Sequence, residues 1–290
     1  MSTPYKVLVI AGGGVFGVIP AALLASQFKD EALDKTFDCF AGTSIGGILS
    51  MCYASGTSAM NVLHDFKSMG KKAFPEMPWW WRMNPFRTKH DGKGLEQVLL
   101  DMLPMTLGKL RKPVIIPTVD FEHNKPKVFD TLIQDADAKW SAAAAGRATS
   151  AAPTYFPPFL SFIDGGLLAN LPIVVAAAAL RDKKGIKYED MHFLVLGTGT
   201  LPDVQRDMRK VRKWSRVKWI LPLLHFMVRA NEMRSEFIAR QLGLGKLTIF
   251  NPVVLEPDWE LDRADLIPIV EAMAQKHDKE FSRVYEEFCN

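Results

Sequence analysis

Residues 36–53 read TFDCFAGTSIGGILSMCY, and the centre of this stretch is a serine flanked by small residues. An apolar, β-like run comes before Gly42-Thr43-Ser44-Ile45-Gly46, and a helix-like run follows it. Small neighbours let the chain turn sharply from strand to helix, so the Ser44 hydroxyl would project above a sheet at the positive end of the helix. The pattern is typical of a nucleophilic serine, and a serine that only caps the helix is the alternative.

The same alternation of strand and helix extends in both directions along the chain. Short β-branched runs predict strands, and longer apolar or alanine-rich segments predict helices between them. We therefore expect an α/β fold, with a mainly parallel central sheet, helices on both faces and Ser44 on a strand-to-helix elbow. The predicted strands are 5–11, 36–41, 113–120, 127–130, 161–164 and 191–197, and the predicted helices are 20–28, 48–53, 94–103, 142–150, 173–181 and 271–288.

Two further segments have an unusual composition. Residues 69–87 are rich in Pro, Trp and Met, which predicts an irregular flap, and residues 205–243 form a long helical region with basic and aromatic side chains. Neither segment looks like a linker between domains. We interpret residues 1–290 as a single domain, with a motif-bearing core from about 5 to 255 and a C-terminal helix from about 265 to 288.

Composition excludes several classes of protein. Hydrophobic residues make up 48% of the 290, enough for a large core, so a disordered chain is excluded. The net charge of +4 does not by itself indicate binding to nucleic acid. Cys39, Cys52 and Cys289 fit no metal-binding spacing, so we expect reduced, buried thiols in a cytoplasmic protein. Residues 7–25 carry no charge, but three adjacent glycines favour a buried strand, turn and helix over a signal peptide or a membrane span.

A glycine motif follows the first predicted strand. Gly12, Gly14 and Gly17 match G-x-G-x-x-G between a strand and a helix. Such a loop presents backbone N–H groups to a pyrophosphate, which would indicate a dinucleotide-binding module with Asp38 as its acidic partner. The same N–H groups could instead face an oxyanion, or the glycines could serve only tight packing. The motif alone leaves these three interpretations open.

A serine nucleophile needs a group that takes its proton. The histidines after Asp164 are His192, in a predicted strand, and His225 and His277, in predicted helices, and none has the loop setting of a catalytic base. Asp164 ends a predicted strand and precedes two glycines, so another loop could approach it closely. A desolvated carboxylate bonded to the hydroxyl can act as the base, although an isolated Asp-Gly-Gly is also a common turn.

Taken together, these motifs resemble the patatin-like phospholipases. The resemblance is carried by Gly12-Gly13-Gly14-Val15-Phe16-Gly17, Gly42-Thr43-Ser44-Ile45-Gly46 and Asp164-Gly165-Gly166 in this order, and residues 148–156, 170–172 and 196–200 are also similar to the family. It implies Ser44 as nucleophile, Asp164 as its direct base, and an oxyanion hole at Gly12, Gly13 and Gly14, with Gly17, Gly42, Gly46, Gly165 and Gly166 as supporting motif residues. It also implies phospholipid or other acyl-ester substrates and neither a metal nor an organic cofactor. Phe16 and Ala11 stand where the family often has a basic residue and an aspartate.

Two clusters predict contact with a lipid surface. Arg209, Lys210, Arg212 and Lys213 lie beside Trp214, and a basic helix with tryptophan can lie on an anionic membrane. Trp79-Trp80-Trp81 is the second cluster, as an interfacial flap or a wall for acyl chains. The alternatives are a solvated helix face for the first and a local hydrophobic cluster under a loop for the second. We therefore expect a cytoplasmic enzyme with peripheral membrane contact and no nucleic-acid partner.

Overall fold

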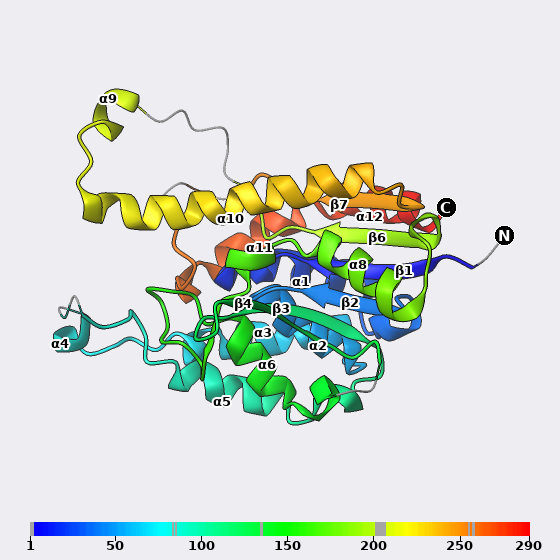
Figure 1. Ribbon diagram of the computed structural model, residues 1–290, viewed down its shortest axis with the longest axis horizontal. Helices are drawn as coiled ribbons and strands as arrows, with labels where there is room; N and C mark the ends of the chain where they lie inside the picture. Colours follow the sequence, from blue (N-terminus) through cyan, green and yellow to red (C-terminus); the bar gives the residue numbers. More distant parts are fainter. Residues whose placement is uncertain are drawn as a thin grey trace.

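A computed structural model shows one central sheet with helices on both faces (Figure 1). The structure describes residues 3–82, 84, 86–133, 136–200, 207–254, 256 and 259–290. The strands are β1 (Tyr5–Ile10), β2 (Cys39–Gly42), β3 (Val114–Asp120), β4 (Lys125–Asp130), β5 (Phe162–Ile163), β6 (Met191–Leu196) and β7 (Lys246–Phe250). The predicted α/β class is confirmed.

The sheet is mainly parallel, as predicted. Its order is β4-β3-β2-β1-β6-β7, and β5 pairs with β3 away from this path. The strands β3, β2, β1, β6 and β7 run parallel to one another, whereas β4 and β5 are antiparallel to β3. Since the parallel strands share a direction, the loops after β1, β2 and β6 all lie at one end of the sheet, which is where ligands bind in open α/β folds.

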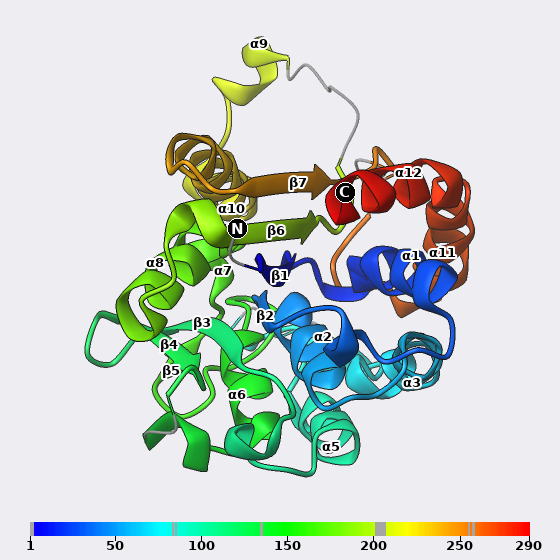
Figure 2. The ribbon, with the colours of Figure 1, turned by 90° about the vertical axis from the view of Figure 1, so that its right-hand side faces the viewer.

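Helices cover the two faces of the sheet unequally (Figure 2). One layer contains α1 (Val18–Phe28), α2 (Ile45–Ala54), α3 (Ala59–Ala73), α5 (Lys93–Met102), α6 (Ala142–Thr149), α11 (Ile267–Gln275) and α12 (Asp278–Cys289). The other contains α7 (Gly166–Ala169), α8 (Ile173–Lys184) and α10 (Arg216–Gln241). Two short helices, α4 (Trp79–Arg82) and α9 (Met208–Val211), project from the body (Figure 1).

Alternation along β1 explains the two layers. Leu8 and Ile10 belong to the core cluster of the larger layer, and Val7 and Val9 belong to the cluster that faces α8. All four side chains have no exposed surface. Successive side chains of a strand point to opposite faces, so a continuous apolar run is what a strand covered on both faces requires.

Several predicted boundaries were wrong. Residues 69–73 belong to α3, and α3 has a sequence signal in its Ser58 cap, whose side chain accepts the Asn61 N–H. The predicted C-terminal helix is two helices, α11 and α12, and β7 was not predicted at all. Residues 83 and 85 of the predicted flap lie outside the described residues, and so do residues 205 and 206 of the predicted helical region.

Two other predictions concern burial and membrane insertion. Cys39 and Cys52 are buried, as expected, but Cys289 is exposed, because it ends the last helix. Among the described residues, no helix is both long enough and apolar enough to cross a bilayer.

Candidate active site

Ser44 stands on a strained turn between β2 and α2. Its backbone angles are φ 54° and ψ −126°, in a region that side-chain-bearing residues rarely adopt. A Cβ at Gly46 would overlap the carbonyl groups of Ile10 and Ala11, so the turn can pass this close to β1 only with glycine there. The Ser44 N–H donates to Thr149 Oγ1 at 2.9 Å, which helps to hold the turn. The predicted elbow is therefore present.

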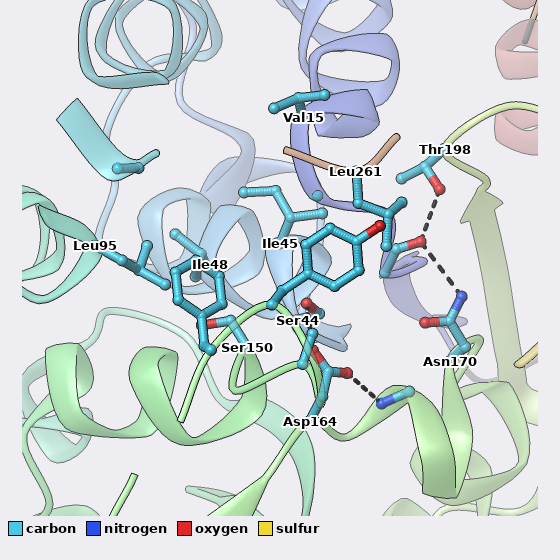
Figure 3. A pocket seen from close by; sticks show the side chains of 18 of the residues that line it. Val15, Ser44, Ile45, Ile48, Leu95, Ser150, Asp164, Asn170, Thr198 and Leu261 are labelled. Carbon is cyan, nitrogen blue, oxygen red and sulfur yellow. Dashed lines mark hydrogen bonds between the residues drawn. The ribbon is translucent and has the colours of Figure 1, made fainter. Parts of the chain in front are cut away.

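Asp164 lies against Ser44 although 120 positions separate them. It follows β5 and is 8% exposed. The Ser44 hydroxyl donates to Asp164 Oδ2 at 2.9 Å. The Gly166 N–H donates to Oδ1 at 2.6 Å (Figure 3). Burial raises the pKa of Asp164 from 3.8 to about 6, and the two hydrogen bonds oppose this rise only in part. The carboxyl group is thus more basic than usual and still ionised at neutral pH.

The glycine loop after β1 offers two backbone donors. The Gly12 N–H donates to the carbonyl of Asn170 at 3.2 Å, so this N–H is not available to an oxyanion. The Gly12 carbonyl accepts from Thr198 Oγ1 at 2.7 Å and from Asn170 Nδ2 at 3.3 Å (Figure 3). In the described chain no acceptor is assigned to the N–H of Gly13 or Gly14. Both residues line the same cavity as Ser44.

The geometry gives no support to a dinucleotide site. Asp38, the required acidic partner, precedes β2 and accepts the Lys6 N–H at 2.9 Å, at the opposite end of the sheet from the glycine loop. Gly14 has φ 56° and would overlap the Leu261 carbonyl if it carried a Cβ. Leu261 thus lies against the Gly14 side of the loop.

An apolar cavity of about 300 Å³ opens onto Ser44 and Asp164. Figure 3 shows Ile45, Ile48 and Leu95 on one side of Ser44, and Asn170 and Thr198 on the other. The larger wall comes from α2, α3, α5 and the segments near them, through Ile45, Ile48, Phe66, Phe74, Leu95, Val98, Leu99, Met102 and Phe156. Such a wall suits a hydrocarbon chain, with the polar groups confined to one end.

A loop near the C-terminus closes over the glycine motif, and the sequence did not predict it. The Val15 N–H donates to the Leu261 carbonyl at 2.8 Å, and Leu261 lines the cavity. The next residue, Asp262, bonds to His90 at 2.7 Å and to Lys89 at 2.8 Å. Phe16 is buried and stacks on Trp259 with ring centroids 6.3 Å apart. An apolar residue at position 16 therefore fits this chain, because its partner there is aromatic.

The helix α10 adds further polar groups to the cavity. Asn170 Nδ2 donates to Glu232 Oε1 at 2.5 Å, and Glu232 Oε2 accepts from Arg229 at 2.9 Å. His225 also lines the cavity, but the Ser44 hydroxyl is bonded to Asp164 and not to an imidazole. His192 lies in β6, and His277 bonds to Glu280 at 2.9 Å. None of the three histidines is therefore placed as the base of a triad.

Comparison with known proteins identifies the family. A family model described as "Patatin-like phospholipase" matches residues 8–177. The chain belongs to this family. "Patatin-like protein 4" of Arabidopsis thaliana is 32% identical over 221 residues, which is 64% of this chain and 54% of that protein. A "cGAMP-activated phospholipase" of Escherichia coli (strain TW11681) is 31% identical over 223 residues, 67% of this chain and 62% of that protein.

The similarity to known patatin-like proteins covers only part of their length. The chain spans about half to two thirds of these two relatives. Among solved structures, VipD from Legionella pneumophila aligns over 94% of this chain and 68% of its own, with 13% identity and a TM-score of 0.43. The match at residues 8–177 contains the glycine loop, Ser44 and Asp164, whereas Thr198, Glu232 and Leu261 lie beyond it.

Both clusters predicted to contact lipid are largely exposed in this patatin-like chain. Trp79 and Trp80 are exposed, by 75% and 53%. Trp81 is half-buried, its ring nitrogen donates to the Thr88 carbonyl at 2.9 Å, and Arg87 lies over its ring, so it has a structural role in the flap. The basic cluster at α9 is exposed, through Arg209, Lys210, Arg212 and Lys213, and Trp214 packs edge-on against Trp219. Within the ranges that the structure describes, no group of three His, Cys, Asp or Glu side chains is placed to hold a metal ion.

Proposed function

We propose that the chain hydrolyses acyl esters of lipids with a Ser44–Asp164 dyad. The observation that carries the proposal is the 2.9 Å hydrogen bond from the serine hydroxyl to a buried carboxylate, at the polar end of an apolar cavity. Membership of the patatin-like phospholipase family supports the same reaction class. Two further observations support it: the raised pKa of Asp164, and the N–H groups of Gly13 and Gly14, which have no acceptor among the described residues.

The reaction would proceed in two balanced steps. Asp164 takes the proton of the Ser44 hydroxyl as its oxygen attacks the ester carbonyl, and the resulting oxyanion is stabilised by the N–H groups of Gly13 and Gly14. The protonated Asp164 then gives this proton to the leaving alcohol, and an acyl-serine remains. Water attacks the acyl-serine, Asp164 takes its proton, and the acid leaves while Ser44 recovers its hydrogen. This route uses neither a metal nor an organic cofactor.

Asn170 and Thr198 position the donor peptide in this scheme. Both hold the carbonyl oxygen of Gly12, and the N–H of Gly13 belongs to the same planar peptide and points the opposite way. Gly12 itself would act through this carbonyl, since its N–H is bonded to Asn170. The proposed oxyanion hole is therefore Gly13 and Gly14, with Gly12 as the anchor of the loop.

Phospholipids or other acyl-ester lipids are the substrates that we propose. The cavity wall is apolar over most of its extent, which suits an acyl chain, and relatives carry the name phospholipase. The exposed Trp79 and Trp80 and the basic residues of α9 support contact with the lipid surface that presents the substrate. We further propose a cytoplasmic protein with peripheral membrane contact, in which residues 1–290 form one domain, because strands from Tyr5 to Phe250 share one sheet.

Hydrolysis of p-nitrophenyl butyrate and of phospholipid vesicles tests the proposal. The parent, Ser44→Ala and Asp164→Asn are compared, and Ser55→Ala serves as a matched control because Ser55 is half-buried and bonded to the Cys52 carbonyl outside the cavity. Each protein is checked by circular dichroism. Three relatives are named as cGAMP-activated, so every assay is run with and without cGAMP.

The expected result is cleavage by the parent and by Ser55→Ala, and a loss of roughly 10³-fold or more in both dyad variants. Full activity in Asp164→Asn would show that another group is the base. A parent that cleaves no ester under either condition would contradict the proposed activity itself.

A further inference from the structure

The helix α10 has two faces with different surroundings. Its inner face lines the cavity and bonds to α7 and to the segment after it: Asn231 donates to the Leu168 carbonyl, and Ser235 donates to the Leu171 carbonyl, each at 2.5 Å. Its outer face carries Trp219, Leu223, Phe226, Ala230, Met233 and Phe237. Phe226 and Phe237 are 66% and 68% exposed, which is unusual for phenylalanine. One helix thus joins the proposed active site to an uncovered apolar surface.

The spacing of the outer residues makes them a continuous stripe. They follow one another at alternate steps of four and three residues, so they share one side of the helix. From Trp219 to Phe237 the stripe is roughly 27 Å long at the usual rise of an α-helix. Exposed apolar surfaces of this extent mark sites that another molecule covers.

Charge indicates what covers the stripe. Asp207 is the only acidic residue between positions 207 and 231, whereas the same segment contains seven basic ones: Arg209, Lys210, Arg212, Lys213, Arg216, Lys218 and Arg229. An anionic surface is attracted by this segment. A second copy of the chain, docked through the same face, would bring like charges together and be repelled.

The place of the stripe in the fold agrees with a lipid surface. In Figure 1, α9 and the first part of α10 project beyond the end of the sheet at which Ser44 lies, and α4 with the exposed Trp79 and Trp80 projects from the same end. The cavity that would receive an acyl chain is lined by Leu224 and Val228, on the other side of the same helix. One side of α10 thus faces the proposed acyl-chain cavity, and the opposite side carries the stripe.

We propose that the outer stripe of α10, with the basic cluster of α9 beside it, docks on the surface of an anionic bilayer. The apolar side chains enter the interface, and the basic side chains contact the lipid phosphates and carboxylates. The choice of a bilayer as partner rests on the charge of this segment and on the proposed lipid hydrolysis, but docking does not require that Ser44 reacts. The two proposals can therefore fail separately.

The test measures binding of the Ser44→Ala chain to vesicles, since this variant leaves the lipids intact. Co-sedimentation is measured with phosphatidylcholine vesicles with and without phosphatidylserine, at low and high salt. Phe226→Gln/Phe237→Gln, the stripe variant, replaces the two most exposed side chains of the stripe without changing charge. Met60→Gln/Ile133→Gln is the matched control, because these side chains are 42% and 46% exposed and lie at the other end of the parallel strands. Thermal unfolding followed by circular dichroism verifies each fold.

We expect binding to the phosphatidylserine vesicles that high salt weakens, and a Kd about tenfold higher or more in the stripe variant but unchanged in the control. Equal binding by the stripe variant and its parent would overturn the proposal, as would an equal loss in the control. If the parent does not bind the vesicles and elutes as a dimer in size-exclusion chromatography, whereas the stripe variant elutes as a monomer, the stripe is a self-association surface and the proposal is wrong. If the stripe variant is unfolded, the variant Arg209→Gln/Lys213→Gln is tested in its place. Binding of this variant to anionic vesicles with the same Kd as the parent would then refute the docking proposal.

Discussion

Replacing Asp164 by asparagine should stabilise the fold at neutral pH while it abolishes hydrolysis. The pKa of Asp164 is raised from 3.8 to about 6 because the carboxyl group is buried. Between these two values the native state binds more protons than the unfolded state, so the free energy of unfolding of the parent falls as pH rises through this window. Above it, the ionised carboxylate costs the native state about 3 kcal/mol, at ~1.4 kcal/mol for each unit of pKa. Asparagine is neutral and of the same shape, so it avoids this cost.

Urea unfolding of the parent and of Asp164→Asn, from below pH ~4 to above pH ~7, measures the effect. We expect nearly equal stability at the acid end and a gap of up to about 3 kcal/mol in favour of the variant at neutral pH. Asp262→Asn is the contrasting control. Burial alone would raise the pKa of Asp262, but its hydrogen bonds to His90 and Lys89 outweigh burial, so the pKa is lowered. This variant should therefore be less stable than the parent at neutral pH. An Asp164→Asn variant that is less stable than the parent at neutral pH, or a gap that does not change with pH, would refute the reasoning.

Three further predictions concern the loop, the cavity and the elbow. Thr198→Val removes the 2.7 Å bond to the Gly12 carbonyl and should lower kcat roughly tenfold with little change in KM, whereas Thr198→Ser should restore it, in steady-state assays with p-nitrophenyl butyrate. Leu95→Trp fills part of the cavity beside its apolar wall and should lower kcat/KM for long-chain p-nitrophenyl esters about tenfold relative to the butyrate. If the dependence of kcat/KM on chain length does not change, this wall does not bind the acyl chain. Gly46→Ala places a methyl group against the Ile10 carbonyl and should lower the free energy of unfolding by about 2 kcal/mol or more, as urea unfolding would show.

Local chemistry made much of the fold predictable. The β1 run is apolar at every position from Val7 to Ile10 because both faces of the sheet are covered, and the elbow needs small residues for a steric reason. Both requirements are visible within a few neighbouring residues. By contrast, β7 lies at the edge of the sheet and is only half-buried over most of its length, so its sequence lacks the apolar run that marks the inner strands.

The candidate site was less predictable where it depends on contacts between distant segments. Ser44 and Asp164 each stand in a motif; the residues alone left Asp164 as either a base or a plain turn, and the family resemblance favoured the base. Asn170 was noted as part of a motif, but its bond to Glu232 joins segments 62 residues apart, and no local pattern marks it. The same holds for Leu261, whose role is its backbone carbonyl, since any residue supplies that group. Trp81 was grouped with its exposed neighbours because sequence does not show that its ring nitrogen has a partner.

The backbone angle at Ser44 also limits which nucleophiles the chain could use. Threonine has a hydroxyl of similar reactivity, but its branched Cβ is strongly disfavoured at φ 54°. Cysteine is unbranched and could occupy the turn, at the cost of a larger atom beside Asp164. The backbone of the turn therefore disfavours threonine before reactivity is considered, and it leaves serine and cysteine as the nucleophiles that evolution, or an engineer, could place there.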